Sequence, residues 1–379
     1  MEGCRLWGVS ILVAAVSGVA SPMQASAIEL GELVAIHGAA RGIVQHGRYK
    51  NATNEEDQEL DQETRGAAIV DLDIDFHPTP LDTFWARLRF AGGNALNDVG
   101  GIELPPYNGP LEDDVKDING SGRNYLLEAW YRHTLEFTDG GHLAATGGII
   151  DSTRYIDENR YANDEDTQFM NPAFATPDNR PGAPSYDPGV ALELHGGLWS
   201  LKGVYMKGSN ESIDDFDYFA VQAGYHHSAA TVPGNYRILA YRAAGRLKKP
   251  RGQSDNARMH GLGASIDQAL GDGWGIFFRA FIQNDKEPVV YDRDVSGGIS
   301  INGRHWGRPD DVLGIAYAYL TGSDQAKIDH SHVAEVYLKF HFLRDVDVTF
   351  DVQYQTDRID SPRGNPQAWI VGGRLNFDF

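Results

Sequence analysis

Histidine and carboxylate pairs are the first features of this sequence that could support chemistry. His330 and His332 place two imidazoles on one face of a strand, and His226 begins a second histidine pair. No Cys or HExxH-type partner completes a metal site, so we expect solvated loop histidines and no metal. Asp157 and Glu158 supply two adjacent carboxylates, the side chains that glycosidases use in catalysis. A chain with 53 acidic residues contains many such pairs, however, so this one carries little weight.

The motifs of the common enzyme classes are missing. The sequence contains neither a GxSxG elbow nor a GxxxxGK[ST] phosphate loop. Its single cysteine, Cys4, precedes the apolar stretch near the N-terminus and offers no thiol chemistry later in the chain. The net charge of −20 repels phosphate backbones. We therefore expect no enzyme, no cofactor and no nucleic-acid partner.

The first 27 residues have the pattern of an export signal. Arg5 precedes the apolar run "GVSILVAAVSGVA", and Ala25-Ser26-Ala27 matches the small-residue site of signal peptidase. The run is shorter than the roughly 20 residues that span a bilayer, which argues against an uncleaved anchor. The sequence thus predicts a cleaved signal peptide over residues 1–27 and a mature domain over residues 28–379.

Period-two alternation is the main structural signal after residue 27. In "AAIVDLDIDF", residues 67–76, apolar side chains alternate with Asp71, Asp73 and Asp75, and "FWARLRFA" alternates in the same way. The segments "HVAEVYLKFHF" and "VDVTFDVQY" repeat the pattern near the C-terminus. Such alternation predicts β-strands with one apolar and one polar face. A transmembrane barrel combines this pattern with low overall hydropathy, because only alternate residues face lipid.

Long and short connections follow one another along the chain. The long segments lie near residues 49–66, 93–124, 151–189, 206–217, 244–257, 284–294, 321–331 and 355–367. Seven tighter joints, such as "FTDGG" and "LGDG", lie between them. The fold class predicted is all-β: a transmembrane antiparallel β-barrel of about 16 strands with long external loops and short periplasmic turns. The terminal segment "AWIVGGRLNFDF" resembles the assembly signal of outer-membrane barrels and ends on phenylalanine.

Charged residues on the polar faces are the candidate solute-binding groups. Arg87 and Arg89 stand on the strand after the one that carries Asp71 and Asp73, so the two strands are expected to form a charged ladder. These charges could equally solvate and brace a polar lumen, which every wide barrel requires. Glu128 is a further charged residue expected on a polar, inward-facing strand position.

The third long loop, residues 151–189, is the candidate constriction. A barrel of this size encloses a channel too wide to select small solutes, so a loop must narrow it. Arg154 and Arg160 are the expected constriction residues in this loop. Glu128 and Arg132 extend the charged lining in the strand expected to lead to the loop.

Two segments resemble a known family. The loop motif comprises Ala162-Asn163-Asp164-Glu165, Gln168-Phe169 and Asn171-Pro172, and the second segment comprises Gly307, Arg308, Pro309, Asp311 and Gly314. Both are similar to segments of the carbohydrate-selective porins of the OprB family. The resemblance implies a passive channel for glucose or related sugars, in contact with outer-membrane lipid. Asn163 and Asp164 are candidate constriction residues that could instead form Asx turns, and we favour an Asx turn for Asn171.

Three functional alternatives remain at this level. The first is the sugar porin in the outer membrane of a Gram-negative bacterium, expected as a homotrimer by analogy with other barrels of this size. The second is a general porin or one that prefers anions such as dicarboxylates. The third, from another class, is a soluble periplasmic β-rich protein that binds or hydrolyses carbohydrate. Trp306 and Arg308 fall in a periplasmic turn, where a folding or interface role is expected.

Overall fold

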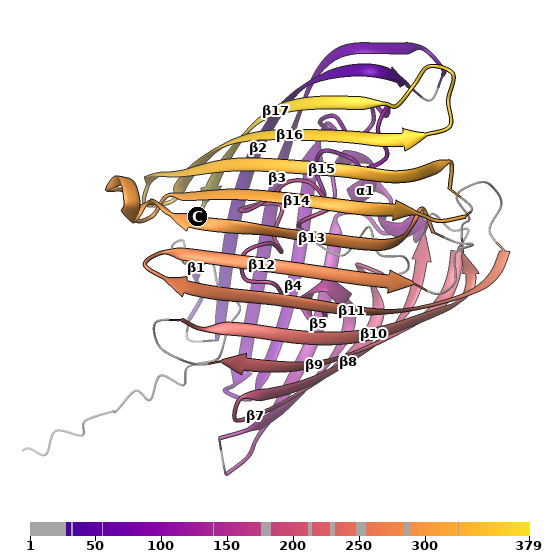
Figure 1. The fold of residues 1–379 in the computed structure, drawn as a ribbon. Coiled ribbons are helices and arrows are strands. Elements are labelled where there is room, and N and C mark those ends of the chain that lie inside the picture. The colour runs from indigo at the N-terminus through magenta and orange to yellow at the C-terminus, as the bar shows by residue number, and fades with distance from the viewer. Residues whose placement is uncertain are drawn as a thin grey trace, which may run out of the picture.

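The chain folds into a closed antiparallel β-barrel (Figure 1). The computed structural model describes residues 28–379 except 32, 55, 139, 176–182, 211–213, 228–231, 248–254, 284–288 and 325, so the predicted signal peptide, residues 1–27, lies outside it. The sixteen strands from β2 to β17 pair in chain order, and β17 closes on β2. The predicted fold class and strand number are confirmed.

The strands are long and the helices are short. The strands are β1 (Ile28–Glu29), β2 (Val34–Thr53), β3 (Glu59–Thr79), β4 (Asp82–Gly92), β5 (Leu126–Glu136), β6 (His142–Ile150), β7 (Asp187–Gly196), β8 (Trp199–Asn210), β9 (Asp214–His227), β10 (Gly234–Leu247), β11 (Asp255–Gly271), β12 (Trp274–Gln283), β13 (Tyr291–Asn302), β14 (Val312–Gly322), β15 (Ile328–Leu343), β16 (Val346–Ile359) and β17 (Gln367–Asp378). The helices are α1 (Glu112–Lys116) and the 3₁₀ turns η1 (Ile118–Gly120), η2 (Ser152–Arg154) and η4 (Gly303–Trp306). In the described residues, none of the helices is both long and apolar enough to cross a membrane.

The alternation read from the sequence sorts side chains between the two faces of the wall. Val70 and Phe90 are exposed on the outside, whereas Asp71 and Arg89 are buried on the inside. The register places Asp71 opposite Arg89 and Asp73 opposite Arg87, which are the partners expected of a ladder. The outer face is thus apolar and the lumen polar, as in barrels that span a membrane.

The last residue, Phe379, extends the pairing that closes the barrel. The backbone N–H of Phe379 donates to the carbonyl of Gly38 at 2.8 Å, and Gly38 N–H donates back at 2.7 Å. The ring of Phe379 covers Gly38 so closely that a Cβ there would lie 2.2 Å from it. The missing side chain at Gly38 thus leaves room for the ring of Phe379 where the C-terminal residue meets β2.

Several external loops are shorter than predicted because the strands extend beyond the alternating segments, whereas the second loop, residues 93–125, has nearly its predicted length. The loop expected near residues 49–66 comprises only residues 54–58, and that expected near 355–367 comprises 360–366. Outside the membrane both faces of a strand meet water, so the apolar alternation ends while the ladder of hydrogen bonds continues. The third loop likewise ends at residue 186, because residues 187–189 pair with β6.

The Gly-Arg-Pro segment forms the turn between β13 and β14. The carboxylate of Asp311 accepts from Arg308 Nε at 2.6 Å, from Trp306 Nε1 at 3.2 Å and from the backbone N–H of His341 at 3.0 Å. A Cβ at Gly303 would lie 2.0 Å from the carbonyl oxygen of Arg308. These contacts bind the turn to the neighbouring hairpin, and the folding or interface role of Trp306 and Arg308 stays a prediction.

Candidate solute pathway inside the barrel

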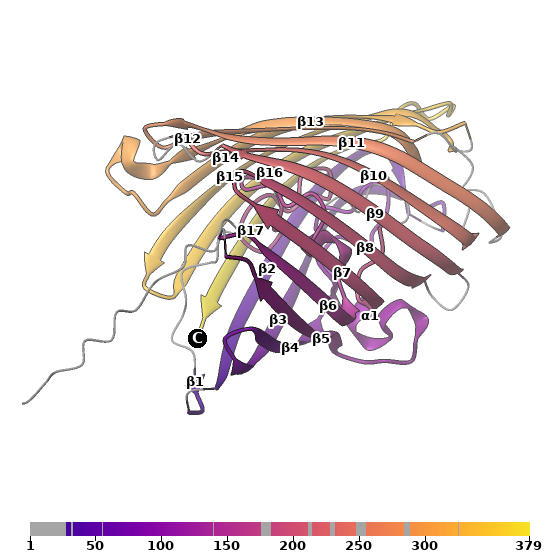
Figure 2. The ribbon, with the colours of Figure 1, turned by 90° about the horizontal axis from the view of Figure 1, so that it is seen from below.

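The third loop, residues 151–186, is attached to inward-facing side chains of the C-terminal strands. Backbone N–H groups of Met170 and Asn171 donate to the two carboxylate oxygens of Glu335 on β15, at 2.5 and 3.0 Å. The Asn171 amide donates to Gln353 on β16 at 3.1 Å. Arg374 on β17 donates to the carbonyls of Glu165 and Gln168. Figures 1 and 2 show the loop within the outline of the barrel.

The same loop is attached to strands in the middle of the chain. Asp157 N–H donates to Gln222 on β9 at 2.8 Å, and the Asp157 carboxylate lies 2.9 Å from the guanidinium of Arg279 on β12. The Asn159 amide donates to Ser265 on β11 at 3.3 Å. Contacts to strands from β9 to β17 therefore hold the loop against the polar face of the wall.

Apolar side chains give the loop a core of its own. Phe169 and Phe174 are completely buried, and Phe169 packs edge-on against Tyr337 at 4.8 Å and against Phe277 at 5.8 Å. This core was not predicted from the sequence. Phe169 and Phe174 are five residues apart without helical or strand periodicity, so only the fold brings them together.

A buried cluster of charges joins the loop to β2, β3 and β4. Asp71 accepts two hydrogen bonds from Arg89, at 2.7 and 2.8 Å, and one from Arg41 at 2.5 Å. Arg89 also donates to Asp166 of the loop at 2.9 Å, and Tyr107 donates to Asp166 at 2.5 Å. Burial alone would raise the pKa of Asp166, but the charges of Arg41 and Arg89 outweigh it and lower that pKa. The cluster is paired and braces the wall.

A second cluster is partly exposed to the lumen. Arg87 binds Asp73 in a bidentate pair at 2.7 and 2.6 Å, and Arg154 Nε lies 2.8 Å from both oxygens of Glu128. The guanidinium of Arg154 stacks 4.2 Å from the centre of the Trp85 ring, and that of Arg87 lies 5.2 Å away. We call these five residues the Trp85 cluster. It combines an aromatic face with planar charged groups of both signs.

Trp85 is the functional candidate that the sequence reading missed. It shares the inward parity of Arg87 and Arg89 in "FWARLRFA", so the signal was present in the alternation itself. Trp130 on β5 stacks on it with ring centroids 5.2 Å apart. Trp85 is only 8% exposed, but its partner Arg154 keeps 35% of its side chain exposed.

The remaining predicted site residues lie outside both charge clusters. Arg132 lies on β5, which is separated from the third loop by β6, and donates to Glu193 at 2.5 Å. Arg160 is exposed and has no ion pair within the described part of the chain. Asn163 and Asp164 accept from backbone N–H groups of Asn159 and Asp166 in the loop. They fix the shape of the loop, as Asn171 does by accepting from Ala173 N–H at 3.0 Å.

The titration of Glu165 is unusual for a loop carboxyl group. Burial, followed by the negative charges of Asp166 and Asp164, raises the pKa of Glu165 to about 8. The positive charge of Arg89 opposes this shift but does not cancel it. The group is therefore mostly neutral at pH 7.

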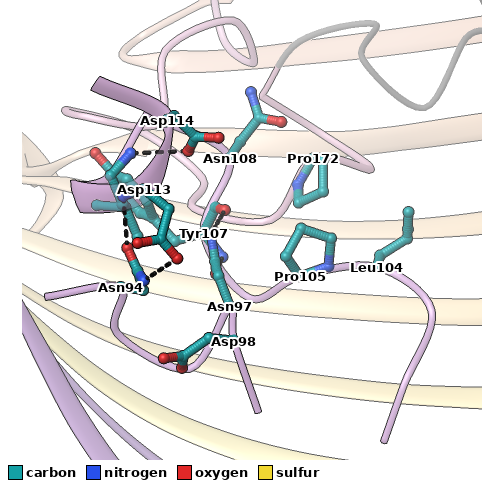
Figure 3. Close-up of a pocket in the computed structure, with 12 residues that line it drawn as sticks. Asn94, Asn97, Asp98, Leu104, Pro105, Tyr107, Asn108, Asp113, Asp114 and Pro172 are labelled. Atoms are coloured by element: carbon teal, nitrogen blue, oxygen red, sulfur yellow. Dashed lines mark hydrogen bonds between the residues drawn. The ribbon is translucent and has the colours of Figure 1, made fainter. Parts of the chain in front are cut away.

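The loop between β4 and β5 contains a pocket of about 450 Å³, closed on one side by Pro172 of the third loop (Figure 3). Asn94 and Asp113 hydrogen-bond to each other, and Asn97 hydrogen-bonds to the backbone of Tyr107. The main polar side chains of the pocket thus stabilise the loop between β4 and β5, which places Tyr107 in the buried charge cluster.

The histidine pairs of the sequence lie in strands rather than in solvated loops, which corrects that expectation. His226 on β9 hydrogen-bonds to Ser200 and Asn235 at 2.9 and 2.7 Å. His330 and His332 lie on β15, where His332 contacts the ring of Tyr319 at 5.2 Å. In the part of the chain that the structure covers, no group of three or more His, Cys, Asp or Glu side chains could hold a metal ion.

Comparison with known proteins identifies the family. Residues 109–379 match the family described as "Carbohydrate-selective porin, OprB family". The chain belongs to the OprB family of carbohydrate-selective porins. An uncharacterized protein of Aquifex aeolicus (strain VF5) is 32% identical over 294 residues, which cover 76% of this chain and 80% of that protein.

Solved porins share the fold at low sequence identity. The high-pH structure of Pseudomonas putida OprB superposes with a TM-score of 0.72 at 15% identity, covering 92% of this chain and 94% of that one. The outer-membrane channel DcaP of Acinetobacter baumannii gives 0.57 at 12% identity, covering 91% and 97%. This OprB-family protein is an outer-membrane protein of a Gram-negative bacterium, so the soluble periplasmic alternative is wrong.

Proposed function

We propose that this OprB-family protein lets carbohydrates, glucose or related sugars, diffuse passively across the outer membrane and that it is a channel without enzymatic activity. The observation that carries the proposal is the Trp85 cluster. Aromatic rings cover the apolar faces of sugars, and planar charged groups pair with their hydroxyls. Trp85, Arg87 and Arg154 supply both kinds of contact within one group on β4 and the third loop.

We propose further that the third loop narrows the pathway. Its attachments to β9, β12, β15 and β17 support a fixed position inside the wall, and its buried phenylalanines support a rigid one. Arg154 stands on this loop opposite Glu128 of the wall. A solute that passes this point would meet the guanidinium of Arg154, which stacks on the nearly buried ring of Trp85.

The balance of charge favours neutral sugars over anions. Arg87 and Arg154 each have a carboxylate partner within 2.8 Å, so the Trp85 cluster carries paired charges rather than a net positive potential. A porin that attracts dicarboxylates needs unpaired cations in its narrow part. Arg160, which is exposed, is the side chain that would support the anion-preferring alternative.

Sugar block of single-channel current tests the proposal. In planar bilayers we expect glucose or maltose to reduce the conductance in a saturable way, and succinate to do so weakly. Trp85→Ala and Arg154→Gln should each weaken the block about tenfold, because a cation–π or aromatic contact contributes roughly 1–2 kcal/mol. Trp199→Ala is the matched control, since Trp199 is 64% exposed on the outer wall. Block by succinate alone would transfer the assignment to the anion-preferring porin.

Ion selectivity should depend on pH through Glu165. This carboxyl group is neutral below its raised pKa of about 8 and becomes an anion above it. We therefore expect cation preference, measured as reversal potential across a salt gradient, to increase with a midpoint near pH 8. Glu165→Gln should abolish the step, whereas Glu63→Gln, on an exposed stretch of β3, should keep it. A step that persists in Glu165→Gln would belong to another group.

The assembly and the export of the protein are also part of the proposal. A homotrimer in outer-membrane lipid, made after cleavage of the signal peptide at residue 27, is the form we propose. Native mass spectrometry of the detergent-solubilised protein would show three copies of the processed chain. The mass of a single copy would contradict the trimer without affecting the sugar-channel proposal.

A further inference from the structure

Three arginines form a basic patch on the outer wall, outside the pore. Arg242 and Arg246 on β10 and Arg258 on β11 are exposed and have the outward parity of their strands. In the register, Ala244 lies directly opposite Arg258, between the two arginines of β10. Each β10 arginine is therefore a diagonal neighbour of Arg258, at about 7–8 Å between backbones. We call this group the arginine patch.

The arginine patch has no protein partner for its charges. Among the residues that the structure describes, none of the three guanidinium groups forms an ion pair or a hydrogen bond. Among the described residues, Asp215 and Asp217 on β9 lie opposite Arg246 and Ala244, but their carboxylates are turned to Lys207, at 2.6 and 3.7 Å. The chain as a whole has a net charge of −20, so a cluster of three unpaired positive charges is opposite in sign to the net charge of the protein.

The aromatic residues at the other end of these strands locate the patch relative to the membrane. Trp199, Tyr225 and Tyr236 form a chain of ring contacts at the periplasmic ends of β8, β9 and β10. Arg246 is ten residues beyond Tyr236, about 34 Å along the strand, and a tilt of about 40° makes this roughly 26 Å of height. That height matches the apolar band of a barrel, so Arg246 lies at the external interface. By the same measure Arg258, opposite Ala244, lies roughly 5 Å below Arg246, and Arg242 lies roughly 10 Å below it.

An apolar surface for acyl chains lies directly below the patch. Ile238 and Leu262 are 67% and 60% exposed on the same two strands, and Ile282 on β12 continues this surface. Arg242 lies two rungs from Ile238 and opposite Phe219, inside the band, where an unpaired charge is costly unless its long side chain extends up to an anionic group at the interface. The occupant must therefore combine anionic groups with several acyl chains.

We propose that the arginine patch docks the phosphorylated glycolipid of the outer leaflet, with its phosphates between the three arginines and its acyl chains on Ile238 and Leu262. Basic clusters at the membrane interface bind anionic lipid head groups, with each arginine contributing to the attraction. The external leaflet of a Gram-negative outer membrane consists of this lipid. The inference depends on the location of the protein and not on the solute that its pore carries.

Binding of Kdo2-lipid A to the detergent-solubilised full-length protein, followed by native mass spectrometry, tests the proposal. We expect R242Q/R246Q/R258Q to bind it roughly 10- to 100-fold more weakly than the unmodified protein. R304Q/R344Q/R363Q, which removes three exposed arginines elsewhere, should bind normally. Removal of the phosphates from the lipid should abolish the difference between the patch variant and the unmodified protein.

Other outcomes would overturn the proposal. Equal binding by the patch variant, or an equal loss in the control variant, would show that no specific docking surface exists. Competition by millimolar inorganic phosphate would indicate a site for soluble anions instead. Unchanged single-channel conductance and heat-modifiable electrophoretic mobility establish that the variants fold. If the triple variant does not fold, Ala244→Glu places a repelling carboxylate among the three arginines, and it too should weaken binding at least tenfold.

Discussion

Replacing Arg279 by alanine is expected to destabilise the barrel by about 3–5 kcal/mol, because it removes the cation of a buried ion pair. Arg279 and Asp157 are 1% and 0% exposed, and their side chains lie 2.9 Å apart. Arg279 also donates to the carbonyls of Phe174, at 2.7 Å, and Ala162. One guanidinium group thus holds three points of the third loop against β12.

The same variant should release the third loop from the wall. Without these contacts we expect larger and noisier single-channel steps and weaker sugar block, together with a lower midpoint of urea unfolding. Arg160→Ala is the matched control for stability, because Arg160 lies on the same loop but is exposed, and its loss should cost less than about 1 kcal/mol. Normal conductance in a destabilised Arg279→Ala barrel would contradict the proposed narrowing by the loop.

The second large effect is expected in the buried charge cluster between β3 and β4. Asp71→Asn alone should cost about 3–5 kcal/mol, because it leaves Arg41 and Arg89 together at a site that is almost completely buried. Arg89→Gln alone should cost a similar amount, because Asp71 and Asp166 then lose a shared cation. The double variant should cost less than the sum by about 1–3 kcal/mol, the coupling typical of contacting residues.

Urea unfolding followed by tryptophan fluorescence measures this double-mutant cycle. The pair of Glu63 and Arg65 on β3 provides the comparison, since these side chains are 35% and 55% exposed and lie 3.4 Å apart. Its coupling should stay below about 1 kcal/mol, because water screens exposed pairs. Additive costs for Asp71 and Arg89 would mean that the ladder does not act as a unit.

The residues that the sequence reading did not find belong to contacts between distant segments. Glu335 and Met170 are 165 residues apart, and Arg374 binds a carbonyl 209 residues earlier. Glu335 alternates with the apolar residues of "HVAEVYLKFHF", but nothing in this strand indicates a partner in the third loop. Trp85 is different, since its parity beside Arg87 already placed it in the lumen.

The sequence by itself determined the barrel, the even number of strands and the face on which the charges of the clearly alternating strands lie. These follow from the period of two, which acts over a few residues and is set by the requirement that alternate side chains meet lipid or water. It also determined the ladder of Asp71 and Asp73 with Arg87 and Arg89, because a short turn fixes the register of consecutive strands.

Only the tertiary structure decided which charges are buried and which remain open to the lumen. Asp71 and Arg89 are covered by Asp166 of the third loop, whereas Asp73 and Arg87 stay partly exposed beside Trp85. Local sequence is nearly the same at both rungs of the ladder. The difference arises from the path of the third loop, which depends on contacts with β9 to β17 that form only when the barrel closes.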